Sequence, residues 1–238
     1  MDSNYTNRIL VGSILIIIVL FSFFFNFELY LISILIPFIT YDFYKSNFSN
    51  PLFLIILTFI PYASHFYLTN EFKEIFIILI CLIVVTTILS NRFKKELFLL
   101  SVYIFCIILF NIALIDRYIF YIIILISFFN DTTAYIFGKT IGGPLIIPKI
   151  SPKKTWSGTF ISFVLSTLLL YFLNFNILFS ALISIFLFLG DIFFSYIKRI
   201  LNLDDFSLIL KSHGGILDRL DSMFFVTIIF QIYLIFII

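Results

Sequence analysis

Residues 97–115 read LFLLSVYIFCIILFNIALI and carry no charged side chain. A helix needs about 20 apolar residues to cross roughly 30 Å of hydrocarbon, where every backbone polar group must be satisfied within the protein. Polar and apolar residues do not alternate here, which argues against a half-buried strand. This stretch is therefore predicted to be a membrane-spanning helix.

Similar apolar runs recur along the whole chain, which is 62% hydrophobic and only 12% charged. No small-residue cleavage site follows the first run, so it is interpreted as a retained span rather than a signal peptide. We predict an all-α, polytopic membrane bundle with about nine transmembrane helices. The predicted spans are residues 9–25, 29–44, 51–69, 75–90, 97–115, 118–137, 159–174, 177–197 and 222–238.

The basic residues predict the orientation of these spans, because Lys and Arg concentrate in cytoplasmic loops. With the N-terminus inside, only Lys73 and Arg117 of the 15 basic residues fall on the outer side, which leaves 13 on the cytoplasmic side. The formal net charge of +2 is small and dispersed, so no nucleic-acid partner is predicted. Cys81 and Cys106 lie inside apolar runs and indicate neither a disulfide framework nor a zinc site.

The chain divides near Tyr121 into two regions of different character. Residues 1–120 form a predicted N-terminal transmembrane region in which no stretch resembles a site. Residues 121–238 form a predicted C-terminal transmembrane region with two longer polar segments, 138–158 and 198–221, both expected on the cytoplasmic side. Any catalytic chemistry is therefore predicted in the C-terminal region.

Acidic residues in and near the second polar segment predict a site for a hard cation. Asp191, Ser195 and Lys198 are spaced by four and three residues and would share one face of a helix. Asp218 and Asp221 would also share a face if their stretch is helical. Carboxylate oxygens suit Mg²⁺, and a nucleotide triphosphate would supply further oxygen ligands. The structural alternative is that Asp191 pairs with Lys198 at a helix end while the later acids lie in a solvated loop.

The first polar segment predicts a place for phosphate groups. Lys153 and Lys154 precede hydroxyl side chains and Gly158 at an expected helix start, where backbone N–H groups and the helix dipole attract anions. Asp131 and Tyr135 lie one turn apart on the preceding helix. An ordinary cytoplasmic loop would also carry lysines, as the positive-inside rule requires.

Together the two segments resemble the phosphatidate cytidylyltransferase (CDP-diacylglycerol synthase) family. Its C-terminal signature is matched in residue type and spacing by Ser195, Lys198, Arg199, Asp205, Ser207, His213, Gly214, Gly215, Asp218, Arg219 and Asp221. Its upstream elements are matched by Asp131, Ala134, Tyr135, Gly138, Ser151, Pro152, Lys153, Lys154 and Thr155. The chain departs from the usual family residues at Ser157, Phe194, Asp204 and Lys211.

The resemblance implies that CTP and phosphatidic acid give CDP-diacylglycerol and pyrophosphate. The catalytic residues would be Ser195, Lys198, Arg199, His213 and Arg219. The nucleotide would be bound by Asp131, Tyr135, Lys153, Lys154, Thr155, Gly214 and Gly215. Mg²⁺, with room for a second cation, would be held by Asp191, Asp218 and Asp221. We expect a multi-pass protein of a bacterial-type inner membrane, surrounded by membrane lipids, with a cytoplasmic active site and with a homodimer as one compatible assembly.

Two other functions share these features. A CTP-dependent kinase of a polyprenol-type lipid alcohol would use similar metal chemistry, but it would release CDP instead of pyrophosphate. A non-catalytic membrane protein or transporter could retain the scaffold. Transporters commonly show inverted repeats, and no such repeat is evident in this sequence.

Overall fold

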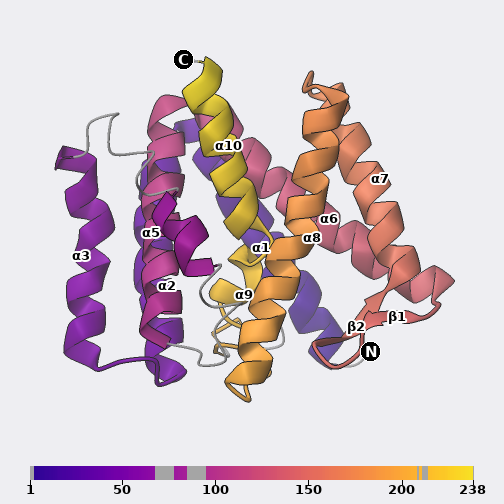
Figure 1. Ribbon diagram of the computed structural model, residues 1–238, viewed down its shortest axis with the longest axis horizontal. Helices are drawn as coiled ribbons and strands as arrows, with labels where there is room; N and C mark the ends of the chain where they lie inside the picture. Colours follow the sequence, from indigo (N-terminus) through magenta and orange to yellow (C-terminus); the bar gives the residue numbers. More distant parts are fainter. Residues whose placement is uncertain (1–2, 68–77, 85–94, 208, 211–213, 238) are drawn as a thin grey trace. The chain divides into compact units, whose positions relative to one another are not determined.

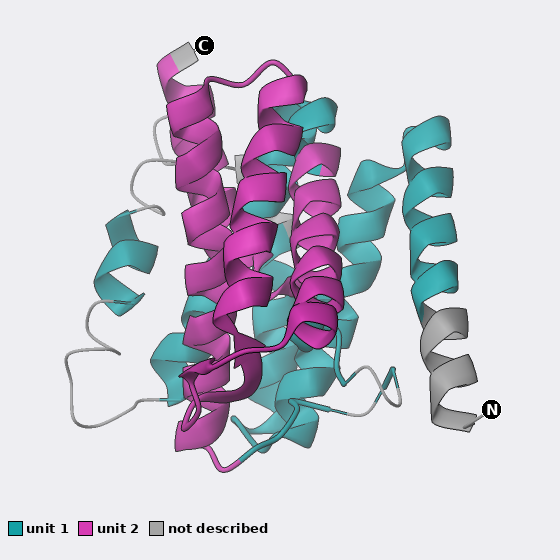
Figure 2. Cartoon of the chain, turned by 90° about the vertical axis from the view of Figure 1, so that its right-hand side faces the viewer, with its two compact units in different colours: residues 1–120, 203–219 teal, residues 121–202, 220–238 magenta. Residues whose placement is uncertain are grey.

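The structure is a computed structural model that describes residues 3–67, 78–84, 95–207, 209–210 and 214–237. The chain forms two compact units (Figure 2). Unit 1 contains residues 1–120 and 203–219, and unit 2 contains residues 121–202 and 220–238. The second polar segment is therefore divided, because most of it belongs to the same unit as the N-terminal helices.

Unit 1 is built on four long helices, and residues 78–84 form a further helical stretch. The long helices are α1 (Ser3–Phe25), α2 (Glu28–Lys45), α3 (Pro51–Tyr67) and α5 (Lys95–Ile115), seen in Figure 1. Helix α5 forms the core, with most of its side chains buried, and it packs against α2 and α3. The Thr40 hydroxyl on α2 and the Tyr103 hydroxyl on α5 share a hydrogen bond of 2.8 Å.

Unit 2 begins within α6 (Arg117–Ile141), which leads to a short antiparallel hairpin of β1 (Leu145–Ile147) and β2 (Ser151–Thr155). Helix α7 (Trp156–Phe172) follows directly and packs against α8 (Ile177–Ile200). The remaining helices are α9 (Leu217–Leu220), at the boundary between the units, and α10 (Met223–Ile237), which packs against α8.

The prediction of a helical, apolar protein is confirmed, with one difference. The first polar segment is not all loop: its middle pairs as the β1–β2 hairpin after Gly142 and Gly143, which both adopt positive φ angles of 70° and 109°. Such angles suit glycine and let the chain reverse direction directly after α6.

Helices α5, α6 and α8 are long and apolar enough to cross a membrane. Shorter apolar helices cover Gly12–Phe25, Pro51–Pro61, Trp156–Phe172 and Met223–Phe236. Large apolar side chains are also widely exposed, as lipid contact would require, among them Ile17, Phe24, Phe59 and Phe172. The span predicted at 75–90 lies largely outside the described residues, and the count of nine stays a prediction.

Candidate active site

The close approach of α8 to the start of α10 depends on Gly190. A Cβ atom at this position would lie 2.5 Å from the carbonyl oxygen of Asp221 and 3.2 Å from that of Ser222. Any larger residue would push the two segments apart. The glycine thus lets the helix residue after it, Asp191, lie in the same part of unit 2 as Asp221.

Asp191 and Asp221 belong to a cluster of charged side chains in unit 2. Lys154 of β2 forms an ion pair with Asp191. Asp221 is only 6% exposed. Burial raises the pKa of Asp221 well above its usual range, and the nearby charges of Asp191 and Asp131 raise it further, whereas Lys198 and Lys154 lower it. The carboxylates outnumber the lysines in this cluster.

Two glycines, Gly138 and Gly158, let the segment predicted to bind phosphates pack closely against α6. A Cβ at Gly158 would lie 2.4 Å from the Ala134 carbonyl oxygen and 2.9 Å from the Gly138 backbone. The predicted helix start is confirmed, since Thr155 is the N-cap of α7 and its hydroxyl accepts a hydrogen bond from the Gly158 N–H at 3.3 Å. Lys154, which directly precedes this N-cap at the end of β2, is therefore held in position for its ion pair with Asp191.

Further hydrogen bonds hold the hairpin that carries Lys154. The Ser157 hydroxyl donates to the Gly142 carbonyl oxygen, so the residue that departs from the family pattern secures the turn before β1. Arg199 Nε at the end of α8 donates to the Ile150 carbonyl oxygen at 3.2 Å. The predicted catalytic Arg199 thus contacts the hairpin backbone.

The glycine segment of the signature lies in unit 1, with Asp218 at its centre. One carboxylate oxygen of Asp218, Oδ2, accepts hydrogen bonds from the N–H groups of Phe206 at 3.0 Å and Gly215 at 2.8 Å. Gly214 has a φ of 78°, and a Cβ there would lie 2.9 Å from the same oxygen. Asp218 therefore stabilises the backbone around it by joining Phe206 to Gly215.

The sequence put Asp218 and Asp221 on one helical face only if their stretch were helical, and that condition is not met. Helix α9 ends at Leu220, Asp221 lies in the turn that follows, and the two residues belong to different units. A four-residue helix cannot present positions from two successive turns on one face. The predicted metal residues thus separate into Asp191 and Asp221 in unit 2 and Asp218 in unit 1.

The other predicted site residues occupy several environments. Asp191, Ser195 and Lys198 all lie on α8, as the spacing predicted, and the latter two are buried. Tyr135 on α6 is exposed, and the ammonium group of Lys139 lies 6.0 Å from its ring centre. Lys153 is exposed and Arg219 is half-buried. His213 lies outside the described residues.

The carboxylates of unit 2 fit a magnesium ion that is shared with a substrate. Within the described part of the chain, no three acidic, imidazole or thiol side chains are grouped to hold a metal ion on their own. Mg²⁺ commonly takes one or two protein carboxylates and completes its shell with substrate phosphates and water. Asp191 and Asp221 offer that oxygen donor set, and a cation would relieve the repulsion that raises the pKa of Asp221.

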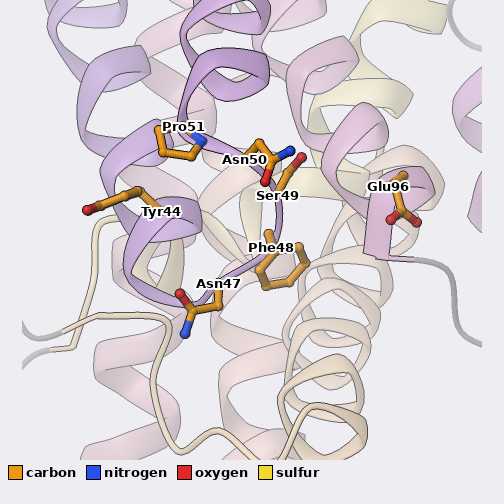
Figure 3. Close-up of a pocket in the computed structure, with 7 residues that line it drawn as sticks. All are labelled: Tyr44, Asn47, Phe48, Ser49, Asn50, Pro51 and Glu96. Carbon is orange, nitrogen blue, oxygen red and sulfur yellow. The ribbon is translucent and has the colours of Figure 1, made fainter.

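Two open pockets of the structure are lined by other residues. One pocket of about 490 Å³ in unit 1 is lined by residues 44 and 47–51 and by Glu96, as Figure 3 shows. A second, of about 530 Å³, surrounds the turn between α7 and α8. No predicted site residue lines either pocket, so neither is the candidate site.

Sequence reasoning missed Asp42 and underrated Asp131. Asp42 on α2 is fully buried and lies against the glycine segment. Asp131, assigned to nucleotide binding, acts electrostatically on Asp221. The signal for Asp42 was present, because a single carboxylate within the apolar run 29–44 is itself a functional candidate.

Known proteins match this chain over different lengths. The sequence model of the Cytidylyltransferase family matches residues 5–237. A phosphatidate cytidylyltransferase of Rickettsia bellii is 44% identical over 109 residues, which cover 39% of this chain and 47% of that protein. One from Aquifex aeolicus is 38% identical over 150 residues, covering 60% and 58%. One from Staphylococcus aureus is 42% identical over 121 residues, covering 47% and 46%. The chain spans about half the length of the curated relatives it matches.

Proposed function

This chain belongs to the cytidylyltransferase family, and from that premise we propose that it is a phosphatidate cytidylyltransferase. It would convert CTP and phosphatidic acid into CDP-diacylglycerol and pyrophosphate. The relatives from Rickettsia bellii and Aquifex aeolicus carry this name, which supports the choice of lipid substrate. The signature residues Ser195, Lys198, Arg199, His213 and Arg219 are the proposed catalytic set.

The ion pair between Lys154 and Asp191 is the observation that best supports the proposal. Lys154 comes from the segment predicted to bind phosphates, and Asp191 precedes the C-terminal signature. A basic group for the triphosphate and an acidic group for its cation are therefore neighbours in unit 2. Buried Lys198 adds a second positive charge beside Asp221.

In the proposed reaction, a phosphate oxygen of phosphatidic acid attacks the α-phosphorus of CTP. A new phosphorus–oxygen bond forms, and the bond between the α-phosphorus and the oxygen leading to the β-phosphate breaks, so that pyrophosphate leaves with the electron pair. Negative charge concentrates around this phosphorus. Lys154 and Lys198 would bind the phosphates and stabilise that charge, because preorganised positive groups act most strongly in a partly buried site.

Asp191 and Asp221 would hold Mg²⁺ in the loaded enzyme. The ion would supply positive charge to the triphosphate oxygens and to the departing pyrophosphate. Lys154, released from Asp191, would then be available to the substrate phosphates. Asp218 is the third predicted ligand, although its Oδ2 already accepts two backbone hydrogen bonds.

The proposed setting is a membrane of the bacterial inner type, where the lipid arrives from the leaflet and CTP arrives from the cytoplasm. Nine spans with the N-terminus inside would put both polar segments on the cytoplasmic side, in line with the basic-residue asymmetry. Cysteines introduced at Ser151 and Ser212 should then be labelled from the same side. A homodimer is compatible with this arrangement.

The deciding experiment uses the purified full chain with Mg²⁺, phosphatidic acid in detergent micelles, and CTP labelled at the α- or the γ-phosphorus. Cytidylyl transfer puts the α-label into the lipid and releases pyrophosphate. A lipid kinase would instead transfer the γ-label to a lipid alcohol and release CDP. Absence of both products with intact protein would support a non-catalytic role.

A further inference from the structure

Asp42 is the one charged side chain among the buried residues of α2, and the others are apolar. It lies near the end of α2 and is 0% exposed. Its Oδ1 accepts a hydrogen bond from the Ser207 hydroxyl at 2.5 Å, and its Oδ2 accepts one from the Leu217 N–H at 2.8 Å. Figure 2 gives residues 203–219 the colour of the N-terminal helices, since both belong to unit 1. Burying a carboxylate costs free energy unless it is hydrogen-bonded or paired. A carboxylate inside a predicted membrane span is therefore a candidate for a functional role.

Gly215 leaves room for the Asp42 carboxylate because it has no side chain. A Cβ atom there would lie 2.5 Å from Asp42 Oδ2, and the next nearest atoms are Asp42 Cγ at 2.8 Å and Oδ1 at 2.9 Å. The backbone of Gly215 lies outside the left-handed region, so an alanine would be excluded by space alone. The second glycine of the signature is thus matched to a residue of the N-terminal region.

Asp42 and Asp218 therefore both bind residues at the two ends of the stretch between Phe206 and Leu217. Asp42 binds Ser207 on the incoming side and Leu217 at the start of α9. Asp218 binds the neighbouring backbone N–H groups of Phe206 and Gly215. Hydrogen bonds to a charged acceptor are stronger than neutral ones, so the two carboxylates hold Phe206 and Ser207 next to Gly215 and Leu217, directly before Asp218 and Arg219.

We propose that Asp42 is a positioning residue for cytidylyl transfer. It fixes the positions of Ser207, Gly215 and Leu217 without touching the substrate. The proposal rests on the proposed function, and it gives the N-terminal membrane region an indirect part in the chemistry. The tight fit at Gly215 further implies that this glycine accommodates a protein carboxylate, a role that differs from the nucleotide contact predicted for it.

The first test replaces Asp42 with Asn, which keeps the size of the side chain and one accepting oxygen. The amide oxygen can still accept from the Leu217 N–H, but the amide nitrogen can only donate to the Ser207 hydroxyl, so the negative charge that strengthens both hydrogen bonds is lost. We expect kcat to fall about 10- to 100-fold, with the KM values for CTP and phosphatidic acid changed less than about threefold. Thr40→Val is the matched control, because it removes a hydrogen bond to Tyr103 from the same helix and should leave kcat unchanged.

The second test measures the contact itself. Gly215→Ala alone should strongly lower both kcat and the thermal midpoint, because its Cβ meets the Asp42 carboxylate. The same change in an Asp42→Ala background should cost much less, because the obstructing group is gone. This non-additivity isolates the pair, and its reading in the thermal midpoint needs no activity.

The outcomes separate the proposal from the function on which it rests. An inactive wild type would refute cytidylyl transfer, while the thermal coupling would still test the contact between Asp42 and Gly215. A normal kcat in Asp42→Asn, an equal loss in Thr40→Val, or additive effects of Asp42→Ala and Gly215→Ala would each overturn the positioning role. If Asp42→Asn does not fold, the Gly215→Ala pair decides.

Discussion

The two units use buried carboxylates in opposite ways. In unit 1, Asp42 and Asp218 accept hydrogen bonds from backbone N–H groups and from the Ser207 hydroxyl. In unit 2, Asp221 lies near the like charges of Asp191 and Asp131. The first pair accepts four hydrogen bonds from the protein's own donors, whereas in the second group Asp221 accepts the Ser222 N–H at 2.8 Å and faces two further carboxylates.

This difference distinguishes carboxylates that stabilise the fold from carboxylates that are candidates for binding a ligand. A carboxylate that accepts backbone N–H groups has its charge stabilised in the folded protein. A buried carboxylate surrounded by others is costly, and perturbed groups of this kind gather at functional sites. Lys154 and Lys198 offset part of that cost, and a cation bound with the triphosphate would offset the rest.

The largest effect should follow from Asp191→Asn. Asn has nearly the shape of Asp but no charge, so the variant should insert and fold while losing the proposed cation contact and the ion pair with Lys154. We expect turnover to fall about 100-fold or more, with partial recovery at high Mg²⁺. Turnover with labelled CTP, normalised to the monodisperse peak in gel filtration, is the measurement. Full activity would leave Asp191 as a structural partner of Lys154.

Asp218→Asn should reduce turnover less than Asp191→Asn if Asp218, like Asp42, mainly stabilises the fold. The amide keeps one oxygen that can accept from the N–H groups of Phe206 and Gly215, so we expect about a tenfold loss of turnover. Asp218→Ala removes the acceptor and should cost about 1–3 kcal/mol of stability for each stranded N–H. A loss in Asp218→Asn as deep as that of Asp191→Asn, at normal stability, would move Asp218 into the metal site predicted from the sequence.

The sequence was sufficient for the helices and for the local motifs, because both depend on neighbouring residues. Apolar length predicted α5, α6 and α8, and the hydroxyl residue before Gly158 predicted the start of α7. The spacing of Asp191, Ser195 and Lys198 was also enough to put them on one helix. Each of these features repeats or ends within a few positions of the chain.

Long-range partners could not be predicted in the same way. The link between Asp42 and Leu217 joins residues far apart in the sequence, and no local pattern carries it. The pairing of Lys154 with Asp191, in preference to the local candidate Lys198, depends on the β1–β2 hairpin. The division of Asp218 from Asp221 follows from the early end of α9, which a sequence without glycine or proline at that point does not signal.

A graded effect is expected from the two adjacent lysines. Lys154 is paired with Asp191 inside the charged cluster, whereas Lys153 is exposed beside it. Lys154→Ala should raise the KM for CTP about tenfold, and Lys153→Ala should raise it only about two- to threefold, since an exposed charge is screened by solvent. The KM for phosphatidic acid should change little in either variant. Equal CTP kinetics in both variants and the wild type would remove the phosphate-binding role.

The smallest effect is expected from Asp221→Asn, which should increase the stability of the protein, whereas the substitutions above should impair its activity or its stability. Because the pKa of Asp221 is raised in the folded protein, the stability that its protonated form provides is complete below the ordinary Asp range and is lost as pH rises through the raised value. Asp221→Asn removes this loss, so in chelator at neutral pH the variant should melt about 2–4 °C higher than the wild type. The gain should shrink toward acid pH, where the carboxyl is protonated in both folded and unfolded chains.

The matched control is Thr227→Val on α10, which removes a buried hydroxyl without changing charge. That control should not become more stable at neutral pH. A wild type that is as stable as Asp221→Asn in chelator would mean that Asp221 is fully compensated by Lys154 and Lys198. Unit 2 would then resemble unit 1, and the contrast between carboxylates that stabilise the fold and carboxylates that are candidates for binding a ligand would disappear.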